Sequence, residues 1–403
     1  MGCCSSKEER ELKYLEKNHI PLDEVSKKHK ADSLKKRSSE IASRDSNPRN
    51  KKSGEFSILQ DPSSNSPAVQ ADEVKEKTPP TSPPSRPQVN NYKPKKPKLD
   101  VKDFQFVNLK GEVRVKPPGS INGQAFSIDT CEDCDLYVVD ACAQVMIDKA
   151  KNCRIFLGPT EGSVFIRDSV SCKFAIICRQ LRTRDCHNMD ISLFCRTMPI
   201  VESSSQLGFF CYDLNYEALT SHMQKAKLST LHNFWSRIYD FTPKAGNWRL
   251  LDPDHTVQKL LAPVPEEAKA AFGEHGKEGP LFVTWGDRDA PSNDYMFVIF
   301  SKKKEEQAMQ FIDEAKQKAT ILRCNKVAIG LDMATKMVNT TSWAKSAERD
   351  LSEGECVGVE ISGPGCVSQL QGSAAALSGY VTEKEEVGAM FRYLGVETGT
   401  GHQ

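Results

Sequence analysis

A repeat of about 19 residues runs through the middle of the chain and limits its fold more than any other feature. Four nine-residue segments align, with starts 19, 19 and 17 residues apart, at residues 126–134, 145–153, 164–172 and 181–189. So short a period is typical of solenoids, in which each repeat buries its apolar side only by stacking on its neighbours. A fold built from stacked coils is therefore the first expectation.

Alternating apolar residues show that each repeat contains two short strands. The first and third positions form one inward set, Phe126 and Ile128, Val145 and Ile147, Val164 and Ile166, Leu181 and Thr183. The ninth position starts a second set, Cys134, Leu136 and Val138, then Cys153, Ile155 and Leu157, then Cys172, Phe174 and Ile176, then Met189, Ile191 and Leu193. Because side chains alternate between the faces of a strand, these sets predict a mainly β chain with a parallel β-solenoid.

The register also indicates whether the cysteines pack in the core or bind a metal. Cys131 and Cys134 have the spacing of half a zinc site, but the sequence has no second pair at that spacing near them. Cys134 falls on the same inward rung as Cys153 and Cys172, where a thiol behaves as a small apolar side chain. Cys131 aligns with small residues at a corner: Ala150, Ser169 and Cys186. We expect packing and no metal site.

Outward positions identify the candidate functional residues. The second position of each segment forms a ladder, Ser127, Met146, Phe165 and Arg182, and Arg184 follows two residues later. The corner before Arg182 is two residues shorter than its counterparts, so we expect a rigid turn there. If Val201 continues the inward set, Glu202 is the next outward rung beside Arg182, roughly 4.8 Å away. Such a pair either orients the arginine or is an ordinary surface ion pair.

The first hundred residues have a different composition. They hold 21 Lys/Arg, 15 Asp/Glu and 11 of the 22 prolines, a net charge of +6 against −5 for the remainder. Residues 1–99 are therefore expected to be a disordered basic tail. Gly2 lies in an N-myristoylation pattern, and Cys3 and Cys4 are candidate palmitoylation sites; two acyl chains are needed for stable anchoring. Without a secretory signal or a transmembrane run, we expect a protein at the cytoplasmic face of the plasma membrane with reduced thiols.

Patterns after the repeat indicate two further parts. Aromatic residues over 208–243 are expected to cap a solenoid domain of residues 100–262, and residues 263–292 have the composition of a linker. In residues 293–403 we expect an α/β domain with helices on one face. Its expected strands are 296–300, 326–331 and 356–361, and its expected helices are 305–318, 342–351 and 367–377.

Three motifs resemble the tubulin-cofactor-C family: Phe-Leu-Gly-Pro at 156–159 with Gly-Ser-Val-Phe at 162–165, Cys-Arg-Gln-Leu-Arg-Thr-Arg-Asp-Cys at 178–186, and Pro-Ile-Val-Glu-Ser-Ser-Ser at 199–205. The resemblance implies a GTPase-activating protein for Arf-like small GTPases in their GTP form, with Arg182 as the arginine finger. It also implies that Gln180 and Glu202 organise the finger. The protein would bind no cofactor itself and would act on the GTP and Mg²⁺ of its partner.

The resemblance further implies that Phe165, Arg184 and their neighbours form the GTPase-facing surface. Arg179 departs from the family, which has a glutamine pair where this chain has Arg179-Gln180. Residues 293–403 resemble a nucleoside-diphosphate-kinase domain. That family uses a histidine nucleophile, and no histidine lies between His275 and His402, so we expect an enzyme regulator without kinase activity.

Three functions follow as hypotheses. The first is a GTPase activator on the inner leaflet of the membrane that serves the transport of lipidated, ciliary cargo. The second is a non-catalytic effector or scaffold, and the third is a folding cofactor acting on tubulin and its GTP. We expect no nucleic-acid partner.

Overall fold

The computed structural model describes residues 100–276, 278–392 and 394, all of which belong to one compact unit. The expected tail, with Gly2, Cys3 and Cys4, and the carboxyl-terminal His402 lie outside the described residues. In the part that the structure describes, no helix has the length and apolar character needed to cross a bilayer.

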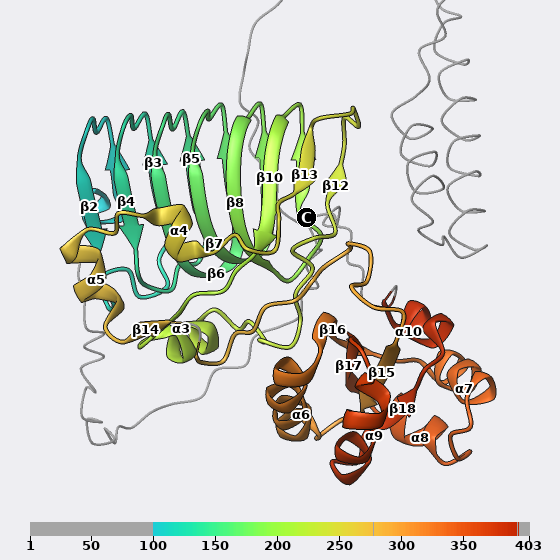
Figure 1. Ribbon diagram of the computed structural model, residues 1–403. Helices are drawn as coiled ribbons and strands as arrows, with labels where there is room; N and C mark the ends of the chain where they lie inside the picture. Colours follow the sequence, from blue (N-terminus) through green and yellow to red (C-terminus); the bar gives the residue numbers. More distant parts are fainter. Residues whose placement is uncertain (1–99, 277, 393, 395–403) are drawn as a thin grey trace, which may run out of the picture. The chain divides into compact units, whose positions relative to one another are not determined.

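A parallel β-solenoid forms the first part of the described chain (Figure 1). After a short helix, η1 (Val101–Phe104), one stack of strands contains β1 (Gln105–Val107), β3 (Phe126–Asp129), β5 (Val145–Asp148), the second halves of β6 (Arg154–Arg167) and β7 (Lys173–Arg184), β9 (Ile200–Glu202) and β12 (Tyr239–Asp240). The other stack contains β2 (Val113–Lys116), β4 (Asp135–Val138), the first halves of β6 and β7, β8 (His187–Cys195), β10 (Ser205–Cys211) and β13 (Trp248–Leu250).

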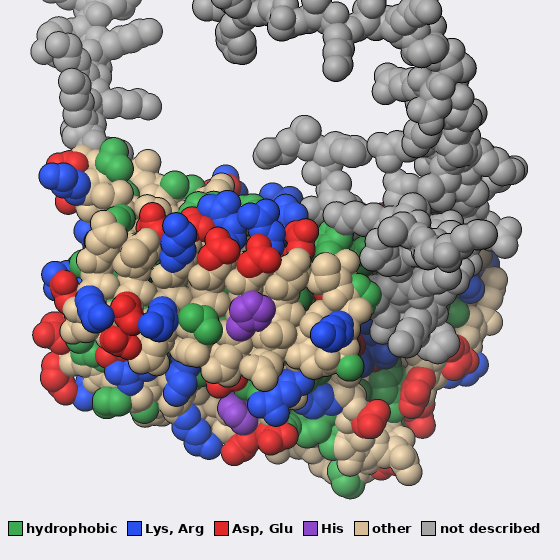
Figure 2. All heavy atoms as spheres, turned by 90° about the horizontal axis from the view of Figure 1, so that it is seen from above, with side chains coloured by type: hydrophobic (Ala, Val, Ile, Leu, Met, Phe, Trp, Pro, Cys, Tyr) green, Lys and Arg blue, Asp and Glu red, His purple; other side chains and the backbone are tan. Residues whose placement is uncertain are grey.

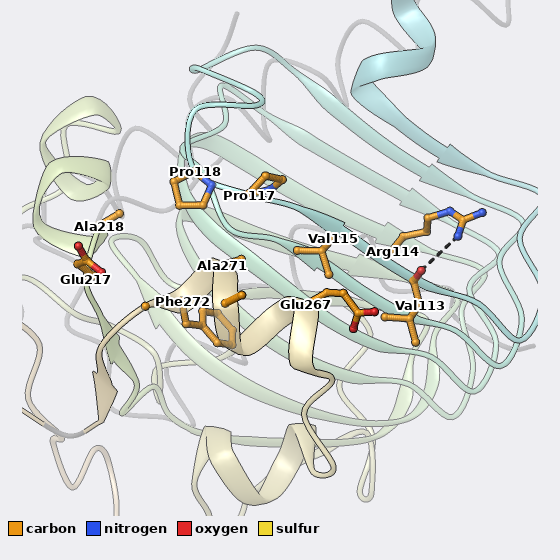
Figure 3. A pocket seen from close by; sticks show the side chains of 12 residues that line it. Val113, Arg114, Val115, Pro117, Pro118, Glu217, Ala218, Glu267, Ala271 and Phe272 are labelled. Carbon is orange, nitrogen blue, oxygen red and sulfur yellow. Dashed lines mark hydrogen bonds between the residues drawn. The ribbon is translucent and has the colours of Figure 1, made fainter.

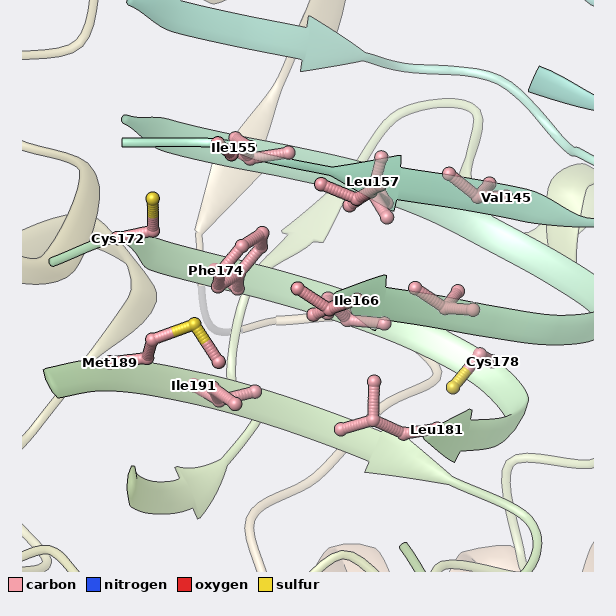
Figure 4. Close-up of a cluster of buried hydrophobic side chains, with 14 of the residues drawn as sticks. Val145, Ile155, Leu157, Ile166, Cys172, Phe174, Cys178, Leu181, Met189 and Ile191 are labelled. Carbon is pink, nitrogen blue, oxygen red and sulfur yellow. The ribbon is translucent and has the colours of Figure 1, made fainter. Parts of the chain in front are cut away.

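The register predicted from the repeat is confirmed. Phe126 pairs with Val145, Val145 with Val164, and Val164 with Leu181. Every side chain assigned to the two inward sets is buried, and all of them except Thr183 belong to a single hydrophobic core. Figure 4 shows these side chains stacked coil upon coil in the interior.

Each coil has a third, shorter side that the sequence pattern does not indicate. It consists of single bridges that join Lys110, Glu132, Lys151, Val170 and His187 in successive coils. Glu132 forms ion pairs with both lysines, at 3.2 Å and 2.8 Å. Figure 2 shows acidic and basic side chains arranged in neighbouring rows across the coils. Residues with positive φ flank this side and turn the backbone at each corner, for example Thr130 and Asp133.

The shortened coil is accommodated differently from the expected tight turn. Pairing between β6 and β7 shifts twice, between Leu157 and Thr160 and again between Thr160 and Ser163. Because the two extra residues are absorbed in β6, β7 continues as one strand of 12 residues that includes Arg182. The backbone beneath Arg182 is therefore held by strand pairing rather than by a turn.

Helices cover the outer side of the second stack. α3 (Leu219–Lys225), α4 (Val257–Leu261) and α5 (Glu266–Phe272) pack on outward aromatic residues such as Tyr137 and Phe156. The rings of Phe156 and Phe272 meet edge to face, with centroids 4.8 Å apart. The small sheet of β11 (Asn215–Tyr216) and β14 (His275–Gly276) joins this layer. Residues 263–292, which were expected to be a linker, thus contain the packed helix α5. The apolar side of this helix is only a few residues long.

An antiparallel sheet of order β16–β17–β15–β18 forms the carboxyl-terminal part. Its elements are β15 (Tyr295–Phe300), α6 (Glu305–Lys318), β16 (Thr320–Ala328), α7 (Leu331–Thr340), α8 (Ala347–Ser352), β17 (Glu355–Ser362), α9 (Cys366–Ala376), β18 (Tyr380–Thr382) and α10 (Glu385–Arg392). Four of the expected elements are confirmed, at β15, α6, β17 and α9. The strand expected at 326–331 overlaps β16 only at residues 326–328, because β16 begins at Thr320 and Leu331 begins α7; the helix expected at 342–351 corresponds only in part to α8.

Helices pack on both faces of this sheet, so the expectation of one covered face is wrong. Met296, Val298 and Phe300 of β15 share a core with residues of α6 and α9. Phe297 and Ile299 share another with residues of α7, α8 and α10. All six residues of β15 are buried, as in a strand covered on both sides.

Candidate functional site

Arg182 lies on the outer face of β7 because its neighbours are required inside. Leu181 and Thr183 are buried in the solenoid core, and the alternation of side chains directs Arg182 outward. It is half-buried and pairs with Phe165 in the preceding coil. Its guanidinium Cζ lies 5.5 Å from the centroid of the Phe165 ring. The sequence-predicted ladder is thus confirmed in its placement.

The two outer faces of the solenoid differ in their cover. On the second stack, Tyr137 and Phe156 are fully buried beneath α3, α4 and α5. On the first stack, Met146, Phe165 and Arg182 remain partly exposed among the described residues. Since apolar and cationic side chains together are left accessible there, this face has the composition of a protein-binding surface.

Glu202 lies beside Arg184, not beside Arg182. β9 pairs with β7 so that Ile200 neighbours Arg182, Val201 neighbours Thr183, and Glu202 neighbours Arg184. Val201 is inward and buried as expected, but the expected rung for Glu202 is wrong by two residues. The small corner residues could have fixed this register, because Ser204 follows Val201 as Cys186 follows Thr183, and its Oγ accepts a hydrogen bond from the Cys186 amide at 3.1 Å.

A second outward column carries charges. Its successive rungs are Asp148, Arg167, Arg184 and Glu202. Arg167 donates to both carboxylate oxygens of Asp148, from Nε at 2.6 Å and from Nη2 at 2.9 Å. Arg184 pairs with Asp185 at 3.3 Å, and both side chains are about half exposed. Arg167 was not among the residues predicted for the site, although the register places it one coil before Arg184.

Gln180 is positioned by a neighbouring coil. Its Oε1 accepts a hydrogen bond from the Ser163 hydroxyl at 2.9 Å, and the two residues are strand partners. Ser163 belongs to a motif but was assigned no role. Arg179 is exposed, and its carbonyl accepts a bond from the Thr197 amide at 2.9 Å. The candidate residues therefore lie close together: Gln180, Arg182 and Arg184 follow one another along β7, with Arg179 beside them, and Phe165 neighbours Arg182 from β6.

The cysteines pack as expected. Cys131 and Cys134 are buried, unpaired thiols in the solenoid core. Burial raises the pKa of Cys131 to about 11, so its thiol stays protonated at neutral pH. In the described ranges, no three His, Cys, Asp or Glu side chains are grouped so as to hold a metal ion.

A cleft of about 810 Å³ lies elsewhere on the solenoid, between the first coil and α5 (Figure 3). Its lining includes Val113, Val115, Pro118 and Phe272, and no residue of the Arg182 ladder. This cleft is therefore separate from the Arg182 surface. A partly exposed guanidinium such as that of Arg182 can donate to an anionic group carried by a macromolecular partner.

Comparison with known proteins gives a consistent picture. Residues 123–241 match the family model described as tubulin binding cofactor C. The chain is 37% identical over 289 residues to Protein XRP2 of Xenopus laevis, covering 69% of this chain and 80% of that protein. It is 35% identical over 300 residues to Protein XRP2 of Homo sapiens, covering 71% and 85%. Tubulin-folding cofactor C of Arabidopsis thaliana is 28% identical over 158 residues, covering 38% and 46%.

Proposed function

Since the chain belongs to the family of the XRP2 proteins, which contains a tubulin binding cofactor C domain, we propose that it is a GTPase-activating protein for an Arf-like small GTPase. Arg182 supplies the arginine finger to the GTP-bound form. The observation that carries the proposal is the position of Arg182, partly exposed beside Phe165 on the face of the solenoid that none of the described helices α3, α4 and α5 covers.

The chemistry requires a guanidinium. Hydrolysis of GTP spreads negative charge over the γ-phosphoryl oxygens and the leaving oxygen, and an arginine supplied in trans accelerates it by roughly 10³ to 10⁵. The planar fork of arginine donates to two oxygens at once and stays charged, whereas lysine offers a point charge. GTP and Mg²⁺ belong to the partner in this proposal, and the present chain contributes Arg182 without a cofactor of its own.

The neighbours of Arg182 take supporting roles. Phe165 supports the guanidinium from the preceding rung, and Gln180, held by Ser163, orients the segment that leads into Arg182. Arg184 and Arg179 contact the GTPase. Glu202 acts through Arg184, its strand neighbour, rather than by holding Arg182 directly.

The experiment that tests this function is single-turnover GTP hydrolysis by an Arf-like GTPase. Wild type is compared with Arg182→Ala and Arg182→Lys, and binding of each variant to the GTP-bound GTPase is measured separately. We expect both variants to bind while losing most of the acceleration. If both accelerate hydrolysis as wild type does, the arginine-finger role is wrong; if wild type binds without acceleration, the chain is an effector.

Lipid attachment and the third part of the chain belong to the same proposal. Myristoylation of Gly2 with palmitoylation of Cys3 and Cys4 would tether the activator to the cytoplasmic face of the plasma membrane, where it serves ciliary cargo transport. Gly2→Ala should move the protein from the membrane fraction to the supernatant, and an unchanged distribution would contradict the tether. Residues 293–403 form a nucleoside-diphosphate-kinase-like domain in this proposal, joined through residues 263–292.

Similarity to Tubulin-folding cofactor C leaves tubulin as an alternative partner. That relative covers 38% of this chain, whereas the XRP2 proteins cover about 70%. The match beyond the solenoid therefore groups the chain with the XRP2 proteins rather than with the tubulin cofactors, and the GTPase remains the first proposal.

A further inference from the structure

One segment connects the solenoid to the carboxyl-terminal sheet on the side where Arg182 lies. Residues 231–241, here called the connecting segment, end in β12, the strand next to β9. β9 in turn pairs with the part of β7 that carries Arg182. Only one strand therefore separates the connecting segment from the proposed arginine finger.

On the solenoid side, the connecting segment is held by backbone pairing. The Phe234 amide donates to the Cys195 carbonyl at 2.7 Å, and the Tyr239 amide donates to Pro199 at 2.8 Å. The Phe241 amide donates to Val201, also at 2.8 Å. β12 itself contains only two residues, and so short a strand needs support from its other side to stay in place.

That support comes from the carboxyl-terminal part and from residues 284–287, which precede its first strand and are held on β16 because the amides of Trp285 and Gly286 donate to Ile321 and Leu322. The Lys326 amide of β16 donates to Nδ1 of His232 at 3.0 Å, and Trp235 donates from Nε1 to the Thr284 hydroxyl at 2.9 Å. Arg237, whose side chain is only 14% exposed, lies with its Nε 3.6 Å from Asp287 and donates from Nη1 to the Arg392 carbonyl at 3.2 Å. The segment is thus fixed between two folded parts.

Asp287 joins Arg237 to a larger cluster of charges. Its carboxylate also binds Arg323 at 2.7 Å, and Arg323 and Arg392 both bind Glu360. Burial alone would raise the pKa of Asp287, but Arg237 and Arg323 outweigh it and hold the pKa at about 2. With three arginines to two carboxylates, neither acid can be lost without leaving a poorly compensated cation.

We infer that the carboxyl-terminal domain, joined to Asp287 through Arg323, holds the Arg182 surface in place through the pair of Asp287 and Arg237, here called the brace. Both residues of this pair act as positioning residues for the proposed GTPase activation. The inference rests on the proposed function. The brace holds β12 on β9, and β9 forms the side of the surface where Ile200 adjoins Arg182. Neither Arg237 nor Asp287 needs to contact the GTPase in this arrangement.

The test uses full-length protein with Asp287→Asn, which keeps the size of the side chain but removes its charge. Asp313→Asn is the matched control, since it breaks an exposed ion pair with Lys316 on α6 of the carboxyl-terminal domain. Arg237→Lys keeps the positive charge and tests whether a cation alone at this position preserves the contact with Asp287. For each protein, hydrogen exchange at Ile200–Glu202 and Tyr239–Asp240 is measured, together with the maximal single-turnover rate and the GTPase concentration that gives half of it.

We expect Asp287→Asn to speed exchange at β9 and β12 by tenfold or more relative to β3 and β5, and to lower the maximal rate about three- to tenfold. The half-saturating GTPase concentration should change less than twofold, Arg237→Lys should be intermediate, and Asp313→Asn should match wild type. Unchanged exchange, or an equal rise in all strands, overturns the brace. Faster local exchange with an unchanged maximal rate overturns the positioning role.

If the wild-type protein itself fails to accelerate hydrolysis, the proposed function is wrong and the positioning role falls with it. Faster local exchange in Asp287→Asn would then still support the brace, so the two failures can be told apart.

Discussion

Arg182 and Phe165 are strand partners in adjacent coils, and the arginine Cζ lies 5.5 Å from the centroid of the phenylalanine ring. Arg167 and Arg184 on the neighbouring column each pair with an aspartate. Within the described residues, no carboxylate lies at ion-pair distance from Arg182. The aromatic ring therefore supports the guanidinium without neutralising its charge.

Phe165→Ala should weaken GTPase activation without abolishing it. A cation–π contact at a partly exposed site contributes about 0.5–1 kcal/mol, which corresponds to a roughly two- to fivefold lower single-turnover rate. Phe165→Tyr should retain the rate, and Met146→Ala, one rung further away, serves as the control. A loss as large as that of Arg182→Ala would show that Phe165 has a role beyond supporting the guanidinium.

Glu202→Gln should affect affinity more than rate. Because Glu202 neighbours Arg184 rather than Arg182, we expect the GTPase concentration for half-maximal activation to rise about two- to fivefold, within the range of exposed charge pairs. The maximal rate should change less than twofold, and Asp185→Asn provides a comparison on the other side of Arg184. If Glu202→Gln instead lowers the maximal rate alone, Glu202 acts on the finger.

Gly158→Ala should destabilise the solenoid. An added Cβ would lie 2.4 Å from the Asp140 carbonyl oxygen, and this backbone is held because the Asp140 carboxylate accepts hydrogen bonds from the amides of Ile121 and Ala141. We expect the free energy of unfolding to fall by about 1–3 kcal/mol, as measured by urea denaturation. Gly372→Ala on α9, where the Cβ would meet no atom within 4 Å, should be neutral or stabilising.

Acid should destabilise the protein through His232. Burial, followed by the nearby charges of Arg196 and Lys326, lowers the pKa of His232 to about 4, against about 6.5 in an unfolded chain. The folded state binds the proton less well than the unfolded chain does. The contribution of neutral His232 to the free energy of unfolding is therefore fully present above pH 6.5 and is lost as the pH falls toward 4, by about 3 kcal/mol in total.

The measurement for His232 is the free energy of unfolding at pH 7 and pH 5. His232→Asn keeps a hydrogen-bond acceptor near the Lys326 amide and should reduce the loss between the two pH values. His187→Asn, on the exposed third side of the coils, is the control and should leave the loss unchanged. An equal loss in wild type and His232→Asn would assign the acid sensitivity to other groups.

Much of the solenoid follows from local pattern. The alternation of side chains and the repeat together predict that Phe126, Val145, Val164 and Leu181 stack inward and that Arg182 points outward, and the pairing confirms both. The packing of the cysteines follows for the same reason. These features are accessible to sequence because a strand has a period of two and each coil repeats the environment of the last.

The pairing register of the last coils was harder to predict from the sequence. Whether Ile200 or Glu202 lies beside Arg182 depends on the segment between β8 and β9, because the offset between paired residues changes from 17 at Cys178 and Cys195 to 18 at Arg182 and Ile200. Sequence spacing alone does not locate such irregularities, since a slip of one or two residues preserves most of the apolar pattern.

Local pattern is enough to predict that this chain forms a solenoid with Arg182 on its outer surface, because strand alternation and repeat length act over a few residues. The fold alone establishes which residue adjoins Arg182, that α5 packs on the solenoid, and that Arg237 lies beside Asp287. These outcomes depend on contacts between segments far apart in the chain, whose partners are selected by packing and charge once the coils have formed.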